Sequence, residues 1–246
     1  MNEQLLLGNI RGVLIRLEET IIFNLIERAQ FQHNAKVYDP AEVAEATGGE
    51  SLVGYLLHET ERIHSRIRRY TSPDEEPYFT DLRAPFLPLL SFVENPIKPN
   101  DININPDIRK VYEGEIVPYI CRPGDDGQYG SSAVSDTSCL QAISKRIHYG
   151  KFVAESKYLT HQDEFQAMID ARDADGLLEA ITDRAVEKTV LERVRLKAQT
   201  YGQDIGGDTT QLKIEPKRVA DVYARWIIPL TKKVEVQYLL RRPDDE

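Results

Sequence analysis

Cysteine is scarce in this sequence, since only Cys121 and Cys139 occur among 246 residues. Neither stands at the spacing that a metal site requires, and two cysteines cannot build a disulfide-rich scaffold. A pair of this kind suits a reducing compartment. We therefore expect no metal site and no disulfide core.

Long apolar runs are also missing. No segment approaches the roughly 18 apolar residues that a membrane span needs. The start MNEQLLLGNIRGVLIRLEE is an amphipathic pattern with acidic residues, unlike a signal or transit peptide. The sequence favours a cytoplasmic protein without a membrane partner. A plastid stroma is equally compatible if a transit peptide has been removed.

Positive charge is not in excess, because the net charge is −9 and the isoelectric point lies near 5.2. This balance disfavours nucleic acid as a partner, since binding to phosphates depends on accumulated positive charge. One local exception is the segment ERIHSRIRRY, which has four arginines in eight residues. No aromatic or Gly-rich nucleic-acid motif surrounds it, so we interpret it as a solvated helix face or a site for one small anion.

Strand-like alternation is nearly absent, whereas apolar residues recur three and four positions apart through most of the chain. We predict an all-α protein, a bundle of long packed helices that forms a single domain over residues 1–246. The predicted helices span residues 5–32, 51–70, 108–120, 132–158, 163–171, 175–181, 184–201 and 216–241. Pro229 should bend the last helix, because its ring removes one backbone hydrogen bond. The Gly-rich segment YGQDIGGD should interrupt the helical pattern before it.

The segment KRIHYGKFVAESK, residues 145–157, is the most informative stretch. Arg146 and Lys157 are eleven residues apart, which on a helix is roughly three turns and about 20° of drift, so they point the same way. Gly150 and Val153 lie between them on the same strip. The helix therefore offers a small hollow with a cation at each end, which would suit a compact dianion.

The alternative is that these cations are ordinary helix surface, which is the commoner case on spacing alone. Their placement argues against it. Lys145, Lys151 and Glu155 fall on the polar side of the helical wheel, whereas Arg146 and Lys157 sit at the edge of its apolar side. An unpaired charge is unfavourable there, so we expect anionic partners for both.

Two other helices carry polar residues beside an apolar face. Arg11 lies next to Leu14 and Ile15, and Asp183 and Glu187 are four residues apart at a helix start. Asp183 then has an ordinary interpretation as a helix cap, with Glu187 facing water.

Thr231 and Glu235 form a further pair with a spacing of four, in the last predicted helix. For Glu235 the ordinary interpretation is an exposed partner of Lys232 or Arg241. Such pairs point to a site only if they converge in space.

Several long motifs resemble the chorismate mutases of fungi and plants, and together they cover essentially the whole chain. They are, in order, NIRGVLIRLEETIIFNLIERAQF, HSRIRRYTSPDEEPYF, GDDGQYGSSAV, SKRIHYGKFVAESKY, TYGQD and IIPLTKKVEVQYLLRR. The resemblance implies an all-α homodimer that converts chorismate into prephenate by a Claisen rearrangement, in the biosynthesis of phenylalanine and tyrosine. This pericyclic reaction implies no metal and no cofactor.

The resemblance also assigns the site by position. It implies catalytic roles for Arg11, Arg146, Lys157 and Glu235, and substrate contacts for Val153, Asp183, Glu187 and Thr231. Asp183 departs from the Asn that is usual in fungal members. Glu235 would have to be protonated to donate to the ether oxygen of the substrate, and burial would raise its pKa in that direction while Lys157 would lower it.

Members of this family are commonly inhibited by tyrosine and activated by tryptophan, at a site between two subunits. Arg68, Arg69, Gln128, Gly130 and Ser131 match its positions, with Gln128 in place of the usual Asn. Two competing hypotheses remain. One is a catalytically decayed amino-acid-binding or interaction protein on the same scaffold, and the other is an exported mutase, which would need a leader sequence.

Overall fold

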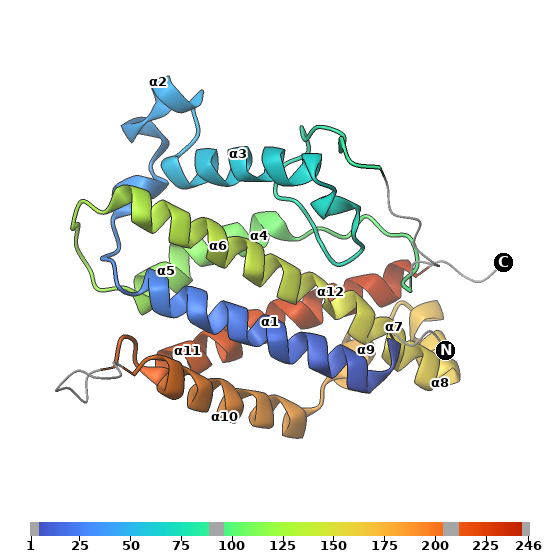
Figure 1. Cartoon of the computed structure of the whole chain (residues 1–246). Helices are drawn as coiled ribbons and strands as arrows, with labels where there is room; N and C mark the ends of the chain where they lie inside the picture. Colours follow the sequence, from blue (N-terminus) through green and yellow to red (C-terminus); the bar gives the residue numbers. More distant parts are fainter. Residues whose placement is uncertain (1–4, 89–95, 204–211, 243–246) are drawn as a thin grey trace.

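The computed structural model describes residues 5–88, 96–203 and 212–242. Within these ranges there is no β-strand, only two isolated bridges, which confirms the all-α prediction (Figure 1). The helices are α1 (Leu7–Arg28), α2 (Ala44–Thr47), α3 (Leu52–Arg66), α4 (Asn105–Val111), α5 (Val117–Ile120), α6 (Tyr129–His148), α7 (Gly150–Thr160), α8 (Gln162–Asp170), α9 (Ala174–Ile181), α10 (Arg184–Tyr201), α11 (Pro216–Val222) and α12 (Ile228–Arg241). Short 3₁₀ turns lie at Ala35–Tyr38, Pro40–Glu42 and Arg69–Thr71.

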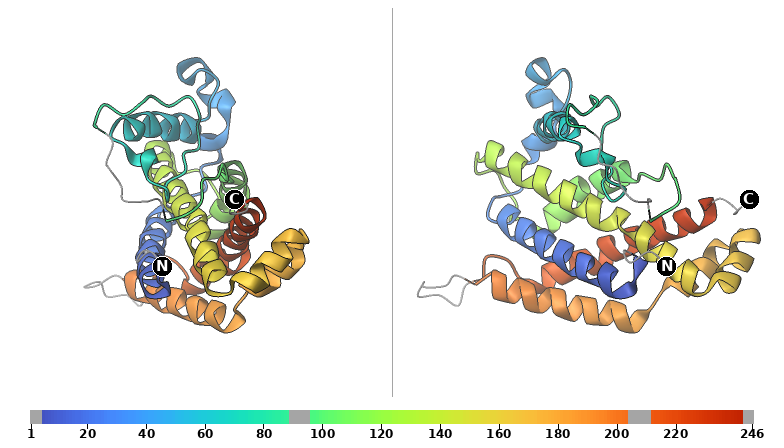
Figure 2. Two further views of the ribbon diagram at one scale, coloured as in Figure 1. Left: turned by 90° about the vertical axis from the view of Figure 1, so that its right-hand side faces the viewer. Right: turned by 45° about the vertical axis from the view of Figure 1, so that its right-hand side comes forward.

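The helix pair α1 and α6 forms the middle of the molecule, and the other long helices cover it. α3 packs on α6, α10 packs on α1, and α12 crosses behind both, where it packs against α6 and α7 (Figures 1 and 2). The core is one contiguous apolar cluster that includes Ile22, Leu57, Leu140 and Val234. α6, α7 and α12 therefore meet inside the bundle, which brings the two most informative polar segments of the sequence together.

A buried polar cluster fixes α1 against α6. The Nε of Arg28 donates to Oδ1 of Asp136 at 2.7 Å, and both side chains are fully buried. The hydroxyls of Tyr38 and Tyr112 donate to the same carboxylate at 2.8 Å each. Because every partner here is satisfied, the cluster can lie in the core without a large desolvation penalty.

The long central helix, predicted as residues 132–158, begins earlier and is divided into α6 and α7 at Tyr149. Tyr149 keeps helical dihedral angles, with φ −62° and ψ −13°, so the two pieces follow one another closely. The division falls directly before Gly150, and glycine is a poor helix former. The predicted ends of the first two helices were also too late, since α1 ends at Arg28 and α3 at Arg66.

Two prolines follow wide helical turns. A π turn, Tyr223–Ile227, directly precedes α12 and its Pro229, and a second, Tyr112–Ile116, precedes Pro118. A proline ring clashes with the carbonyl of the fourth residue before it, and a π turn relieves this contact. The disruption expected at Pro229 therefore takes the form of a π turn. Part of the predicted break at YGQDIGGD lies outside the described residues.

None of the helices in the described ranges is long and apolar enough to span a membrane. Cys121 and Cys139 are buried free thiols.

Candidate active site

The two cations predicted to share one helix strip both face α12. Arg146 is 9% exposed, and its Nη1 lies 3.4 Å from Oγ1 of Thr231. The Nζ of Lys157 lies 3.7 Å from Oε2 of Glu235 and donates to the carbonyl of Ile181. The structure thus brings four of the predicted site residues together across one helix contact.

The hollow that the sequence predicts between these two cations is not open at Gly150. Thr231 and Glu235 cover this glycine so closely that a Cβ there would lie 3.1 Å from Cγ2 of Thr231. α12 therefore fills the space directly over Gly150. Val153, one turn further on, is half-buried.

The polar side of the wheel was assigned wrongly. Lys151 is only 1% exposed and pairs with Glu76 at 2.7 Å, while Glu155 is 4% exposed and pairs with Arg242 at 3.0 Å. Lys145 pairs with the two acidic residues directly before Glu76. Segments distant in sequence cover this face, and periodicity within one helix carries no information about them.

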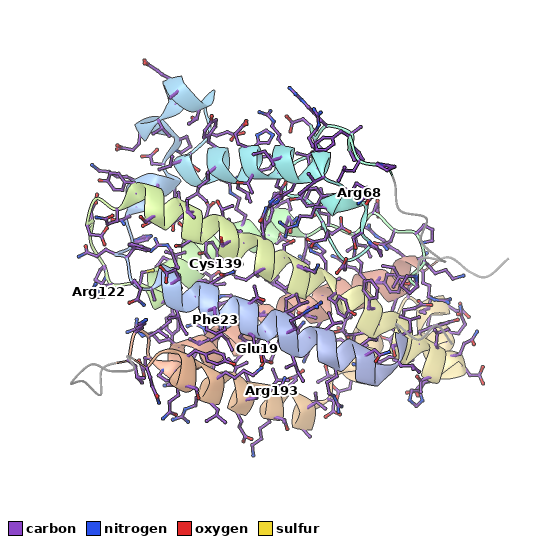
Figure 3. All side chains as sticks on the ribbon, in the orientation of Figure 1. Glu19, Phe23, Arg68, Arg122, Cys139 and Arg193 are labelled. Atoms are coloured by element: carbon purple, nitrogen blue, oxygen red, sulfur yellow. The ribbon has the colours of Figure 1, made fainter. Side chains whose placement is uncertain are left out.

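Arg146 has no carboxylate partner among the residues that the structure describes. Glu18, one of the two carboxylates whose charge acts on Arg146, is 2% exposed. Arg193 holds both oxygens of Glu18, at 3.0 Å and 2.8 Å, and Lys197 adds a third contact at 3.1 Å. Figure 3 shows Arg193 and the neighbouring Glu19 between α10 and α1. Glu18 is thus paired with α10 and forms no ion pair with Arg146 in the described chain.

Burial lowers the pKa of Arg146, with the charges of Tyr223, Glu235 and Glu18 acting in the opposite direction. Arginine nevertheless remains protonated in proteins. A cation that is both desolvated and unpaired has a high affinity for a carboxylate. The position of Arg146 is thus typical of a binding group and not of a helix-surface residue.

Glu235 is a buried carboxyl with an unusual proton affinity. It is 6% exposed, and burial raises its pKa to about 7, although Lys157, Arg146 and Lys232 all pull it down. Within the described chain, Oε2 has no hydrogen-bond partner, since the 3.7 Å separation from Lys157 is an ion-pair distance only. The group can therefore be protonated near neutral pH and can donate a hydrogen bond.

The two acids at the start of α10 differ in what they contact. Oδ1 of Asp183 accepts from the backbone N–H groups of Ala185 and Val186 at 3.0 Å each, so this side chain caps α10, as the ordinary interpretation expected. Glu187 instead lies 2.5 Å from Nζ of Lys232. Lys232 therefore forms its ion pair with Glu187 and not with Glu235. The sequence spacing alone did not predict this ion pair.

Arg11 is exposed on α1, and the structure records no contact between it and the other predicted site residues. α1 packs against α7, so Arg11 is carried on a helix that borders the strip of Arg146 and Lys157.

The predicted effector residues fall into two separate groups. Gly130 and Ser131 line a hollow of about 610 Å³ at the start of α6, and Gln128 directly precedes that helix. Arg69 lies just beyond the C-terminal end of α3 and donates to Gln141 of α6 at 2.9 Å. Gln141 is ten residues beyond Ser131 and thus about 15 Å further along α6. Arg68 lies at the same end of α3 (Figure 3). One chain alone does not bring these groups together.

The described residues contain no group of histidine, cysteine and acidic side chains that could hold a metal ion.

Residues 128–236 match the family model described as chorismate mutase type II. The chain is 48% identical to the chorismate mutase of Schizosaccharomyces pombe over 98% of both chains. It is also 48% identical to chloroplastic chorismate mutase 1 of Petunia hybrida, over 98% of this chain and 77% of that protein.

Solved structures agree with these matches. The Candida albicans chorismate mutase Aro7p in complex with L-Trp superposes with a TM-score of 0.92 at 44% identity, over 98% of this chain and 93% of that one. AtCM1 with tyrosine bound in its allosteric site gives a TM-score of 0.91 at 45% identity, over 99% and 98% of the two chains. With this identity along its whole length, the chain belongs to the chorismate mutase family.

Proposed function

We propose that this family member rearranges chorismate to prephenate at the face where α6 and α7 pack on α12. The observation that carries the proposal is Arg146, a buried cation with no carboxylate partner in the described chain. Beside it lies Glu235, a buried carboxyl whose pKa is raised to about 7. A site for a dianion that must receive a hydrogen bond during the reaction needs these two properties together.

The cations supply binding and shape. Chorismate has two carboxylates, and Arg11, Arg146 and Lys157 would hold both of them. A planar guanidinium suits a carboxylate, because it can donate two parallel hydrogen bonds. Holding both ends favours the compact, chair-like conformer and removes rotational freedom before the reaction.

The donors act on the transition state. As the C–O bond of the ether breaks, negative charge grows on its oxygen, and a donor already aimed there stabilises the transition state more than the ground state. Lys157 and protonated Glu235 would be these donors. Glu187, held in place by Lys232, would accept from the ring hydroxyl of the substrate, while Val153, Thr231 and the α10 start at Asp183 line the site.

Regulation by tyrosine and tryptophan needs a second copy of the chain. Arg68 and Arg69 of one copy would meet Gln128, Gly130 and Ser131 of the other, because one chain holds the two groups apart. An amino acid would present its carboxylate to the arginines, and binding across the interface can bias two quaternary states.

The surface of α3 supports this homodimer. Tyr55 and Ile63 on α3 and Ile67 directly after it are exposed apolar residues, Ile63 at 65%. Exposed apolar side chains that gather on one surface can mark an interaction site.

For the compartment two candidates remain, the cytoplasm and the plastid stroma, and the Petunia hybrida relative is chloroplastic by name. A single domain over residues 1–246 also stays a prediction.

The test is the initial rate of chorismate loss for the purified chain and for Arg146→Ala. We expect conversion to prephenate and a fall in kcat/KM of more than about a hundredfold in the variant, since a desolvated charge-assisted contact is lost. Arg195→Ala, an exposed arginine on α10, is the matched control and should keep its activity. Absence of turnover in the unaltered protein, with tyrosine or tryptophan still bound, would favour the decayed binding protein.

A further inference from the structure

Gly150 is the first residue of α7, and its Cα faces α12. A Cβ built on it would lie 3.1 Å from both Cγ2 and the carbonyl oxygen of Thr231, and 3.2 Å from Cγ of Glu235. Ordinary van der Waals contacts of a Cβ begin at 3.4 Å. Any side chain at this position would therefore press on two residues of the proposed active site.

The backbone does not require glycine here. Gly150 lies in a helix, and its φ is not among the positive values found at Gly48, Gly49, Gly124 and Gly127. In a helix, glycine lowers stability relative to alanine. What glycine provides here is therefore the close approach of α7 and α12.

Two contacts to α12 flank Gly150, one from α6 and one from α7, and both are long. Arg146, one turn earlier, reaches Thr231 at 3.4 Å, and Lys157, two turns later, reaches Glu235 at 3.7 Å. The carbonyl of Thr231 is part of the α12 backbone and cannot rotate away. A methyl group at position 150 would thus shift the helices apart by a few tenths of an ångström or turn the Glu235 side chain, and either change would lengthen two contacts that already measure 3.4 Å and 3.7 Å.

We propose that Gly150 is a positioning residue for the rearrangement. Its missing side chain lets α12 approach the junction of α6 and α7, which aligns Arg146 of α6 with Thr231 and Lys157 of α7 with Glu235. The proposal rests on the proposed function, since it assigns these four residues to one active site.

The first test compares Gly150→Ala with Gly114→Ala. Gly114 lies in the π turn before Pro118 and has open space around the position of a Cβ, so it is a matched control for the change itself. We expect kcat to fall by about tenfold in Gly150→Ala, because displacements of a fraction of an ångström misalign reacting groups. Far-UV circular dichroism should stay unchanged, and Gly114→Ala should keep its activity. Equal kcat values in all three proteins would overturn the proposal.

A rescue experiment separates positioning from a general structural effect. Thr231→Ser removes Cγ2, one of the atoms that the new methyl would meet, and keeps the hydroxyl. Gly150→Ala should therefore reduce kcat less in the Thr231→Ser background than in the unaltered protein. The rescue should be partial, because the carbonyl of Thr231 and Cγ of Glu235 stay close to position 150. An equal or larger loss in that background would contradict a contribution of Cγ2 to the effect.

A readout that does not depend on turnover makes the two proposals separable. Lys157, Arg146 and Lys232 all lower the pKa of Glu235, and a wider helix spacing weakens the first of these. An NMR titration of the Glu235 carboxyl should therefore show a higher pKa in Gly150→Ala than in the unaltered protein. If the unaltered protein does not consume chorismate, the proposed function fails, and this titration still decides the role of Gly150: an unchanged pKa would overturn it.

Discussion

Arg28 and Arg146 are two buried arginines in opposite environments. Arg28 is fully buried and donates to Asp136 at 2.7 Å, and its other donors reach the carbonyls of Gln32 and His33, the sulfur of Cys121 and the hydroxyl of Tyr38. Arg146 is almost as buried, but its only hydrogen bond among the described residues is 3.4 Å long. The first arginine has partners for its donors within the protein, whereas the second has no carboxylate partner among the described residues.

The pKa shifts follow the same division. Burial lowers the pKa of both guanidinium groups, but at Arg28 the carboxylate of Asp136, together with Tyr38 and Cys121, outweighs it, so the pKa of Arg28 is raised while that of Arg146 is lowered. Burial by itself therefore does not distinguish a structural charge from a functional one. The number of guanidinium N–H donors that have a partner in the protein distinguishes the two arginines.

The largest expected effect is on stability at Arg28. Arg28→Met should lower the free energy of unfolding by about 3–5 kcal/mol, because it leaves Asp136 buried without its cation. Urea unfolding followed by circular dichroism measures this. Arg28→Met combined with Asp136→Asn should recover part of the loss, and a loss below about 1 kcal/mol, the level of an exposed pair, would show that the cluster is not structural.

The same substitution at Arg146 should give the opposite result. Arg146→Met removes a desolvated, unpaired charge, so the free energy of unfolding should stay within about 1 kcal/mol of the unaltered protein or rise. The same urea titration measures it. A destabilisation as large as that of Arg28→Met would make Arg146 a structural residue and would remove the contrast between the two.

The pH dependence of turnover extends the comparison to Glu235. With a pKa of about 7, this group is mostly protonated below that pH and mostly ionised above it, and only the protonated form can donate. We therefore expect kcat to be highest on the acid side and to fall as the pH rises through about 7. Glu235→Gln keeps a donor that does not titrate, so its pH profile should be flat. A profile that still falls at the same pH in this variant would assign the titration to another group.

The smallest expected effect concerns Lys232, which lies 2.5 Å from Glu187. The pair is partly exposed, so Lys232→Gln should lower kcat/KM by only about two- to fivefold, in line with the modest free energies of such pairs. Initial rates over a range of chorismate concentrations measure it. Lys188→Gln, which removes an exposed pair with Glu192 at 3.9 Å, is the control and should have no effect.

Most of the architecture could be predicted from local pattern. The helical period identified the all-α class and most helices, because each long helix buries one apolar face. Helix ends were less accurate where the stop signal was weak, as at Arg28 and Arg66. The π turns before Pro118 and Pro229 were not predicted, since a bend and a π turn both relieve the same clash.

The positions of the candidate site residues were predictable where the geometry is local, as along α6 and α7, which follow one another closely. Arg146 and Lys157 both contact α12, as their spacing of eleven predicted, and Asp183 caps its helix by a local rule. The pairing of Lys232 with Glu187 and of Glu18 with Arg193 joins different helices, so no periodicity encodes it. The burial of Lys151 under Glu76 was missed for the same reason.

The central proposal is that Arg146 lacks a carboxylate partner within residues 5–88, 96–203 and 212–242 because the substrate supplies one. A crystal structure of the protein with prephenate bound tests this most directly. A carboxylate of the ligand should lie within about 3 Å of the Arg146 guanidinium in a two-pronged contact, with Glu18 still held by Arg193. Prephenate bound elsewhere, or an Arg146 paired with Glu18 in the complex, would contradict the claim.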